Sequence, residues 1–116
     1  MADGPRLICA SADLTEGGAG IRFEVQWYGE TAPAFAIRFR GQVRAYINRC
    51  AHVPVELDWQ EGAFFDADQR FLICATHGAT YEPLTGVCVL GPCRGRRLVP
   101  IEIDEVGGEI FLRASG

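Results

Sequence analysis

The first half of the chain alternates between apolar and polar residues with a period of two, which is the pattern of β-strands that bury one face. The alternation is clearest over residues 21–28 and recurs over 35–39 and 43–47, with Arg40 and Gly41 at the turn between the last two runs. A shorter apolar run covers residues 6–11. We therefore expect an N-terminal strand, followed by three antiparallel strands that lead directly into residue 50.

The last part of the chain predicts two more strands, over residues 98–103 and 109–113, joined by a turn at Gly107 and Gly108. Pro83 and Gly86 predict a turn over residues 81–86. No ten-residue segment carries the apolar stripe of an amphipathic helix. The pattern as a whole predicts an all-β fold.

A chain of 116 residues with 48% hydrophobic content can bury a core as one domain, residues 1–116. Its 11 basic and 15 acidic side chains give a net charge of −4, so neither nucleic acid nor an anionic membrane is an expected partner. The sequence has no run of eighteen apolar residues and no leader, so we expect no membrane span. Five cysteines, an odd number, argue against a disulfide framework and favour a cytoplasmic location.

Two short segments each pair a cysteine with a histidine. The first is Cys50-Ala51-His52 and the second is Cys74-Ala75-Thr76-His77-Gly78, and together they contain both histidines of the chain. Thiolate and imidazole are ligands for iron and for zinc. A structural Cys₂His₂ zinc site is the alternative, but zinc fingers pair Cys with Cys and His with His, whereas each segment here is mixed.

The two segments resemble the ligand boxes of Rieske iron–sulfur domains, and Gly91-Pro92-Cys93 resembles the proline loop that this family places over its cluster. The resemblance implies one [2Fe–2S] cluster per chain, with Cys50 and Cys74 on one iron and His52 and His77 on the other. It also implies a Rieske-type antiparallel β-sandwich with a small cluster-binding lobe inserted at about residues 48–94.

Three further residues are implied to shape the surroundings of the cluster, namely Gly78, Tyr81 and Pro92. Gly78 would allow a tight turn that lets amide N–H groups face the sulfides. High-potential respiratory members carry a Ser after the His-Gly pair and a Tyr two residues later, and here these positions are Ala79 and Tyr81. Because hydrogen bonds to sulfur stabilise the reduced cluster, we expect a potential near the low end of the family, raised slightly by the Tyr81 hydroxyl.

The three remaining cysteines lie outside the two boxes. Cys9 is expected to be a thiol packed in the core. Cys88 and Cys93 are five residues apart across the proline loop, a separation that permits a disulfide. In a reducing cytoplasm we expect them to be free thiols instead.

Two stretches can be interpreted either as structural elements or as contact surfaces for a partner. The segment between the boxes is longer than in small Rieske ferredoxins and carries Trp59, Phe64 and Phe65. Either these aromatic rings cover the cluster loops from a hairpin, or an exposed Trp59 or Phe65 forms part of a docking surface. The basic run Arg94-Gly95-Arg96-Arg97 is either a solvated loop or a contact for an acidic partner.

The resemblance implies a soluble one-electron carrier that receives electrons from a flavin- or NAD(P)H-linked reductase and passes them to an oxygenase or a similar terminal enzyme. It implies no catalytic residue, and no part of the sequence is left over to bind mononuclear iron or a substrate. One alternative is a redox-sensing or accessory subunit of a larger oxidoreductase complex. A second is a cluster-free interaction module, against which the presence of all four ligand residues argues.

Overall fold

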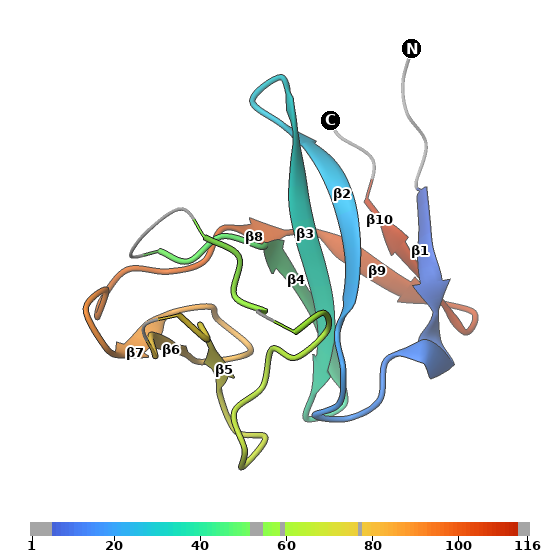
Figure 1. The fold of residues 1–116 in the computed structure, drawn as a ribbon. Helices are drawn as coiled ribbons and strands as arrows, with labels where there is room; N and C mark the ends of the chain where they lie inside the picture. The colour runs from blue at the N-terminus through green and yellow to red at the C-terminus, as the bar shows by residue number, and fades with distance from the viewer. Residues whose placement is uncertain (1–5, 52–54, 59, 77, 114–116) are drawn as a thin grey trace.

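The structure is a computed structural model that describes residues 6–51, 55–58, 60–76 and 78–113. Within these residues the chain forms strands in three antiparallel sheets, and its helical structure is a single 3₁₀ turn at Ser11–Asp13 (Figure 1). The strands are β1 (Arg6–Ala10), β2 (Ile21–Trp27), β3 (Glu30–Phe39), β4 (Gln42–Ile47), β5 (Leu72–Ile73), β6 (Thr80–Tyr81), β7 (Cys88–Leu90), β8 (Pro100–Ile101), β9 (Ile103–Val106) and β10 (Glu109–Leu112). The all-β prediction is confirmed.

The main sheet has the strand order β2-β3-β4-β8, and its first three strands are the ones predicted from the alternating pattern. Arg40 and Gly41 form the turn between β3 and β4, with φ angles of 53° and 76°. Two consecutive residues with positive φ are the signature of a tight turn whose twist matches the paired strands. The sheet therefore carries the chain from β4 straight towards Cys50, as predicted.

Strand β3 is buried on both faces, which the sequence pattern did not indicate. Phe35 and Ile37 face the side on which Cys50 and Cys74 lie, and Ala36 packs with Ile110 on the other side. Alanine suits this position because its small side chain lets a second sheet approach closely. The prediction of one buried and one exposed face was wrong for this strand. Alanine is common both in cores and on surfaces, so its position in the alternating pattern does not show whether that face is buried.

The second sheet has the order β1-β10-β9, and the Gly107-Gly108 turn joins β9 to β10 as predicted. The strand predicted over residues 98–103 is divided in the structure. Pro100–Ile101 pairs with β4 of the main sheet, whereas Ile103–Val106 pairs with β10. The chain passes from the main sheet to the second sheet at Glu102, so the residues predicted as one strand belong to two sheets. The strand that pairs with β10 therefore lies further along the chain than expected.

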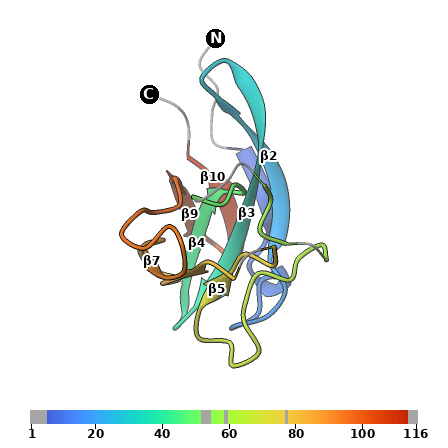
Figure 2. The same ribbon diagram turned by 60° about the vertical axis from the view of Figure 1, so that its left-hand side comes forward.

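The third sheet, β5-β6-β7, forms a small lobe beside the main sheet, on the side away from β1, β9 and β10 (Figures 1 and 2). The Tyr46 hydroxyl of β4 donates a hydrogen bond of 2.7 Å to the Pro83 carbonyl in the predicted turn of the lobe. This buried bond ties the lobe to the main sheet. Among the described residues, no helix is long and apolar enough to cross a membrane.

The segment between the two boxes contains a short hairpin, in which Phe65 bridges Leu72. Phe64 is fully buried, and its ring stacks on that of Phe35 with centroids 4.0 Å apart. Phe65 faces Phe39, with ring centroids 6.0 Å apart. Both rings thus contact β3 of the main sheet, and they pack in the same apolar cluster as Cys50 and Cys74. Trp59 lies outside the described residues.

Candidate metal centre

The first Cys–His segment begins directly after β4 and is a closed loop. The backbone N–H of Cys50 donates to the carbonyl of Val55 at 2.8 Å, which returns the chain to its starting point. The Cys50 side chain is buried, with 3% of its surface exposed. His52 lies inside this loop in the sequence but outside the described residues.

The second segment repeats this closure between β5 and β6. The N–H of Cys74 donates to the Ala79 carbonyl at 2.8 Å, again five residues on, and Cys74 is fully buried. Gly78 has a φ of 75°, a backbone conformation that favours glycine, so the tight turn is present as expected. Its own N–H, however, donates to the Cys74 carbonyl at 2.8 Å and closes the turn rather than facing outward. His77 lies outside the described residues.

A buried polar network positions the first loop, and sequence reasoning missed it. Asn48 precedes Cys50 by two residues and uses both ends of its amide: Nδ2 donates to Asp58 Oδ1 and Oδ1 accepts from the Leu57 N–H, each at 2.9 Å. Asp58 Oδ2 in turn accepts from the Gly62 N–H at 2.9 Å. Asn48 and Asp58 are 1% and 4% exposed, which is unusual for these residue types. The sequence signal for this network was an Asn and an Asp on either side of the first box.

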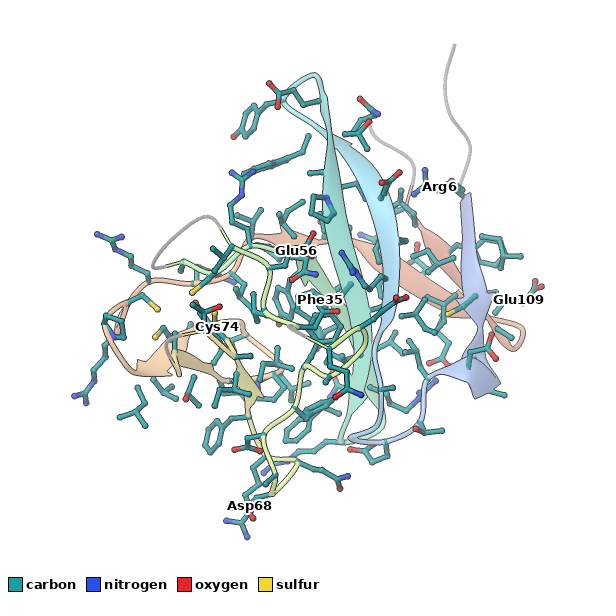
Figure 3. All side chains as sticks on the ribbon, in the orientation of Figure 1. Arg6, Phe35, Glu56, Asp68, Cys74 and Glu109 are labelled. Atoms are coloured by element: carbon teal, nitrogen blue, oxygen red, sulfur yellow. The ribbon has the colours of Figure 1, made fainter. Side chains whose placement is uncertain are left out.

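The two loops are joined by a direct backbone contact. The N–H of Ala75, the residue after Cys74, donates to the Leu57 carbonyl at 3.1 Å. Leu57 is itself held by Asn48, so the network that anchors the first loop also holds the second. Figure 3 shows Cys74 on the lobe side of the molecule, next to the main sheet that carries Phe35.

Tyr81 of β6, the strand after the second loop, brings its hydroxyl group between the first loop and Cys93. The oxygen lies 3.1 Å from Cys50 Sγ and 3.3 Å from Cys93 Sγ, and it accepts a hydrogen bond of 2.9 Å from the Ala51 N–H. Burial, followed by its contacts with the two sulfurs, raises the pKa of Tyr81 well above its ordinary value, so the phenol keeps its proton. That proton is therefore available for the Cys50 sulfur.

The loop that follows β7 packs over the second box. Gly91 has a φ of 109°, and a Cβ placed on it would lie 3.0 Å from the Cα of Ala79, so this glycine allows a close approach of two backbones. Pro92 follows it and is exposed. Cys93 and Cys88 are buried thiols with their sulfurs 2.9 Å apart. Burial, and then the contact with Cys88, raises the pKa of Cys93 to about 11, which keeps this thiol protonated at neutral pH.

The donor set of these loops suits a cluster held by two thiolates and two imidazoles. The thiols of Cys50 and Cys74 are in place on adjoining buried loops. His52 follows Cys50 by two residues and His77 follows Cys74 by three, so at ~3.5 Å per residue each histidine begins within ~10 Å of its cysteine. No three potential metal ligands gather within the described part of the chain, from which both histidines are missing. The assignment of the four ligands therefore remains a prediction.

Solved structures with the same fold include components of one enzyme system. The ferredoxin of carbazole 1,9a-dioxygenase from Nocardioides aromaticivorans IC177 superposes with a TM-score of 0.71 at 21% identity, covering 96% of this chain and 98% of that chain. A chain in a complex of reduced oxygenase and oxidised ferredoxin of carbazole 1,9a-dioxygenase gives 0.69 at 24% identity, covering 92% and 90%. At this level of identity, both likenesses establish the fold alone.

The same fold also occurs within a larger protein. The terminal oxygenase of carbazole 1,9a-dioxygenase from Nocardioides aromaticivorans IC177 gives a TM-score of 0.72 at 20% identity, but this chain spans only 30% of its length. No curated protein matches the chain. The model of one protein family, the Rieske [2Fe-2S] domain, matches residues 5–105, which include both Cys–His segments and the loop of Gly91. Its match over most of the chain shows that this chain, with its two buried cysteine loops, belongs to the Rieske family, whose cofactor is a [2Fe–2S] cluster.

Proposed function

We propose that this protein is a one-electron carrier in which Cys50, His52, Cys74 and His77 hold the cluster. The two thiolates would bind one iron and the two imidazoles the other, which is the ligand set of a Rieske centre. When bound, the cluster supplies reversible one-electron chemistry. The chain itself needs no catalytic residue for this function, because it holds and tunes the redox group and does not transform a substrate.

The observation that carries the proposal is the position of the two cysteines. Cys50 and Cys74 each begin a loop that is closed by a hydrogen bond from the cysteine N–H to the carbonyl five residues later. Both cysteines are buried, so water is kept from their sulfurs. A low-dielectric surrounding strengthens the hydrogen bond from Tyr81 to Cys50. Both features suit a site that must keep one geometry in two redox states, which lowers the cost of reorganisation when an electron arrives or leaves.

We propose protein partners on both sides of the electron transfer: a reductase as donor and a terminal oxygenase or similar enzyme as acceptor. The support is the near full-length likeness to a ferredoxin of carbazole 1,9a-dioxygenase, together with the likeness to chains in oxygenase–ferredoxin complexes of that system. Neither nucleic acid nor a membrane is part of the proposal. A cytoplasmic location suits thiols such as Cys88 and Cys93, which a reducing compartment preserves.

Metal analysis of the purified protein tests the cluster assignment. We expect about two irons and two acid-labile sulfides per chain, as in a Rieske centre, and a red-brown solution with a Rieske-type electron paramagnetic resonance signal after reduction. The replacements Cys50→Ser and His77→Ala should each abolish that signal, whereas Cys9→Ser should keep it. A colourless protein with one zinc per chain would falsify the assignment.

A second measurement separates a carrier from a sensor. The reduced protein is mixed in a stopped-flow instrument with purified oxygenase components of several ring-hydroxylating systems. A carrier is reoxidised by at least one of them much faster than by dissolved oxygen. If none exceeds the rate with oxygen, the redox-sensing alternative becomes the better reading.

A further inference from the structure

The charge of this chain is distributed very unevenly along the sequence. Residues 43–55 and 71–101 supply the two cysteine loops and the loop of Gly91, and they contain five arginines and one acidic residue, Glu82. The rest of the chain holds the other six arginines and the other fourteen acidic residues. The cluster-binding segments therefore carry +4 and the remainder −8, which together give the net charge of −4.

Four of these arginines, Arg49, Arg94, Arg96 and Arg97, are exposed. Within the described part of the chain none of them forms an ion pair, whereas Arg22, Arg38 and Arg113 all do. Arg97 donates to the Thr85 carbonyl at 3.0 Å, and the Arg49 guanidinium lies 5.2 Å from the centre of the Trp27 ring. These contacts hold Arg49 and Arg97 in place without an ion pair. Glu82 is the acidic residue of this part of the chain, and its Oε1 accepts hydrogen bonds from the N–H groups of Leu84 and Thr85.

The arginines lie beside the candidate metal centre. Arg96 Nη1 lies 3.5 Å from the carbonyl of Ala51, the residue after Cys50, and so reaches the first box. Gly91 packs against Ala79, which ends the second box, so the loop that carries Arg94 and Arg96 borders both boxes. In Figure 3, the labelled Asp68 and Glu109 lie at the bottom and the right of the molecule, far from Cys74. Glu56 lies nearer, but its carboxylate is paired with Arg22 at 2.8 Å.

Exposed apolar residues adjoin the arginines. Leu90 is 64% exposed and Val89 is 38% exposed, and Pro92 follows in the same loop. Exposed apolar residues together with arginines match the composition of protein–protein interfaces, in which arginine is enriched and acidic residues are depleted. Leu90 is the most exposed apolar side chain of this segment and lies four residues before Arg94.

We propose that this basic face, formed by Arg49, Leu90, Pro92, Arg94, Arg96 and Arg97, docks the acidic surface of the protein redox partner. The inference rests on the proposed function and deepens it, because it states the charge that a partner must present. The rest of the chain, at −8, repels such a partner. The field therefore orients the encounter so that the candidate metal centre faces the partner, as complementary charge does in steered associations.

The sign of the potential at this face is measured with two small oxidants of opposite charge, ferricyanide and tris(phenanthroline)cobalt(III). The reduced holoprotein is mixed with each in a stopped-flow instrument at ionic strengths from 20 mM to 0.5 M. We expect the ferricyanide rate to fall with ionic strength and the cobalt rate to rise, although the chain as a whole is anionic. The opposite trends would show that the net charge of the whole chain, and not the local charge, controls how the oxidants reach the cluster, and would overturn the proposal.

Charge reversal assigns the effect to the face. At low ionic strength, Arg94→Glu/Arg97→Glu should slow ferricyanide by roughly tenfold and approach the wild-type rate at 0.5 M salt. Arg70→Glu/Arg40→Glu makes the same change of net charge away from the boxes and should alter the rate less than about twofold. Equal slowing by both pairs would overturn the assignment. The midpoint potential of each variant is measured as well, so that a change in driving force is not taken for a change in docking.

Protein acceptors then test docking itself. Plastocyanin with an acidic face and basic cytochrome c accept one electron each, and we expect the acidic acceptor to be favoured at low salt and to lose that advantage in Arg94→Glu/Arg97→Glu. Faster transfer to cytochrome c at low salt would contradict the proposal. A protein that holds no cluster reacts with none of these probes, so failure of the proposed function is distinguished from failure of the docking inference.

Discussion

Tyr81 follows the second cysteine loop in the chain, and its hydroxyl group contacts both the first cysteine loop and the loop of Gly91. Its oxygen contacts Cys50 Sγ, the Ala51 N–H and Cys93 Sγ, all within 3.3 Å. A phenol has one proton to donate, and the oxygen already accepts a bond from Ala51. A thiolate ligand at Cys50 is a stronger acceptor than the neutral thiol of Cys93, so the proton of Tyr81 would point to Cys50.

Replacing Tyr81 by Phe should lower the midpoint potential of the cluster by up to roughly 60–130 mV. The bond to a charged sulfur is worth about 1.5–3 kcal/mol and is stronger in the more negative, reduced state; only the difference between the two states counts, so this range is the upper limit of the shift, with about 59 mV for a tenfold change with one electron. Protein-film voltammetry measures the shift. Tyr46→Phe is the matched control, because this buried hydroxyl donates to Pro83 and to no sulfur in the described structure.

Tyr46→Phe should leave the potential unchanged and cost about 1–3 kcal/mol of stability, since the buried Pro83 carbonyl loses its donor. A potential that moves equally in both variants would show that loss of a buried hydroxyl, and not the bond to Cys50, changes the potential.

At the scale of the elements, three loops determine the site, and each is closed by its own backbone. The two boxes close through the N–H groups of Cys50 and Cys74, and the third loop closes through the Gly95 N–H, which donates to the Cys88 carbonyl at 3.1 Å. The third loop touches the second at Gly91, where the absence of a side chain sets the distance between them.

Gly91→Ala should destabilise the holoprotein and speed the loss of iron to a chelator. A methyl group at this position meets the Ala79 backbone at 3.0 Å and must also adopt a φ of 109°, so the loop is pushed off the second box. Gly95→Ala is the control, because its φ of 92° imposes a similar strain but its methyl group meets nothing within 4 Å. Strained backbone of this kind costs roughly 1–3 kcal/mol.

Both variants should therefore lose stability in chemical denaturation, whereas only Gly91→Ala should release iron faster. Equal rates of iron release would show that the contact between the loops does not protect the cluster.

At the scale of the whole molecule, Arg38 joins the two larger sheets. It extends from β3, where Nη2 pairs with Glu105 of β9 at 2.6 Å and Nε donates to the Leu14 carbonyl at 2.8 Å. Its side chain is only 17% exposed. Arg113 also forms ion pairs, with Glu102 and Asp104, but all three groups are widely exposed and lie on the outer sheet or its border.

Arg38→Met should cost about 1–2 kcal/mol of unfolding free energy, because the part-buried carbonyls of Leu14 and Ser11 lose their donor and Glu105, which is 31% exposed, loses its ion pair. Arg113→Met should cost much less, because water screens exposed ion pairs. Chemical denaturation of the two holoproteins at pH 7 compares them. A loss for Arg113→Met that matches the loss for Arg38→Met would mean that burial does not set the value of these ion pairs.

The sequence by itself determined the parts of this protein that depend on neighbours along the chain. The period of two predicted β2, β3 and β4, and paired glycines predicted the turn between β9 and β10. The spacing of cysteine and histidine predicted the Rieske family. Each of these signals works because the physical constraint, a pleat, a positive φ or a short ligand loop, acts over only a few residues.

The tertiary structure decided what depends on residues far apart. Only the fold shows that Ala36 lies in a core, that Asn48 and Asp58 share a buried hydrogen bond, and that Tyr81 reaches Cys50 across 31 positions of sequence. Only the fold brings the loop of Arg94 and Arg96 beside Ala51. Side chains such as Ala, Asn and Arg are chemically compatible with several environments, so the packing of distant strands, and not their local pattern, fixes the role that each one takes.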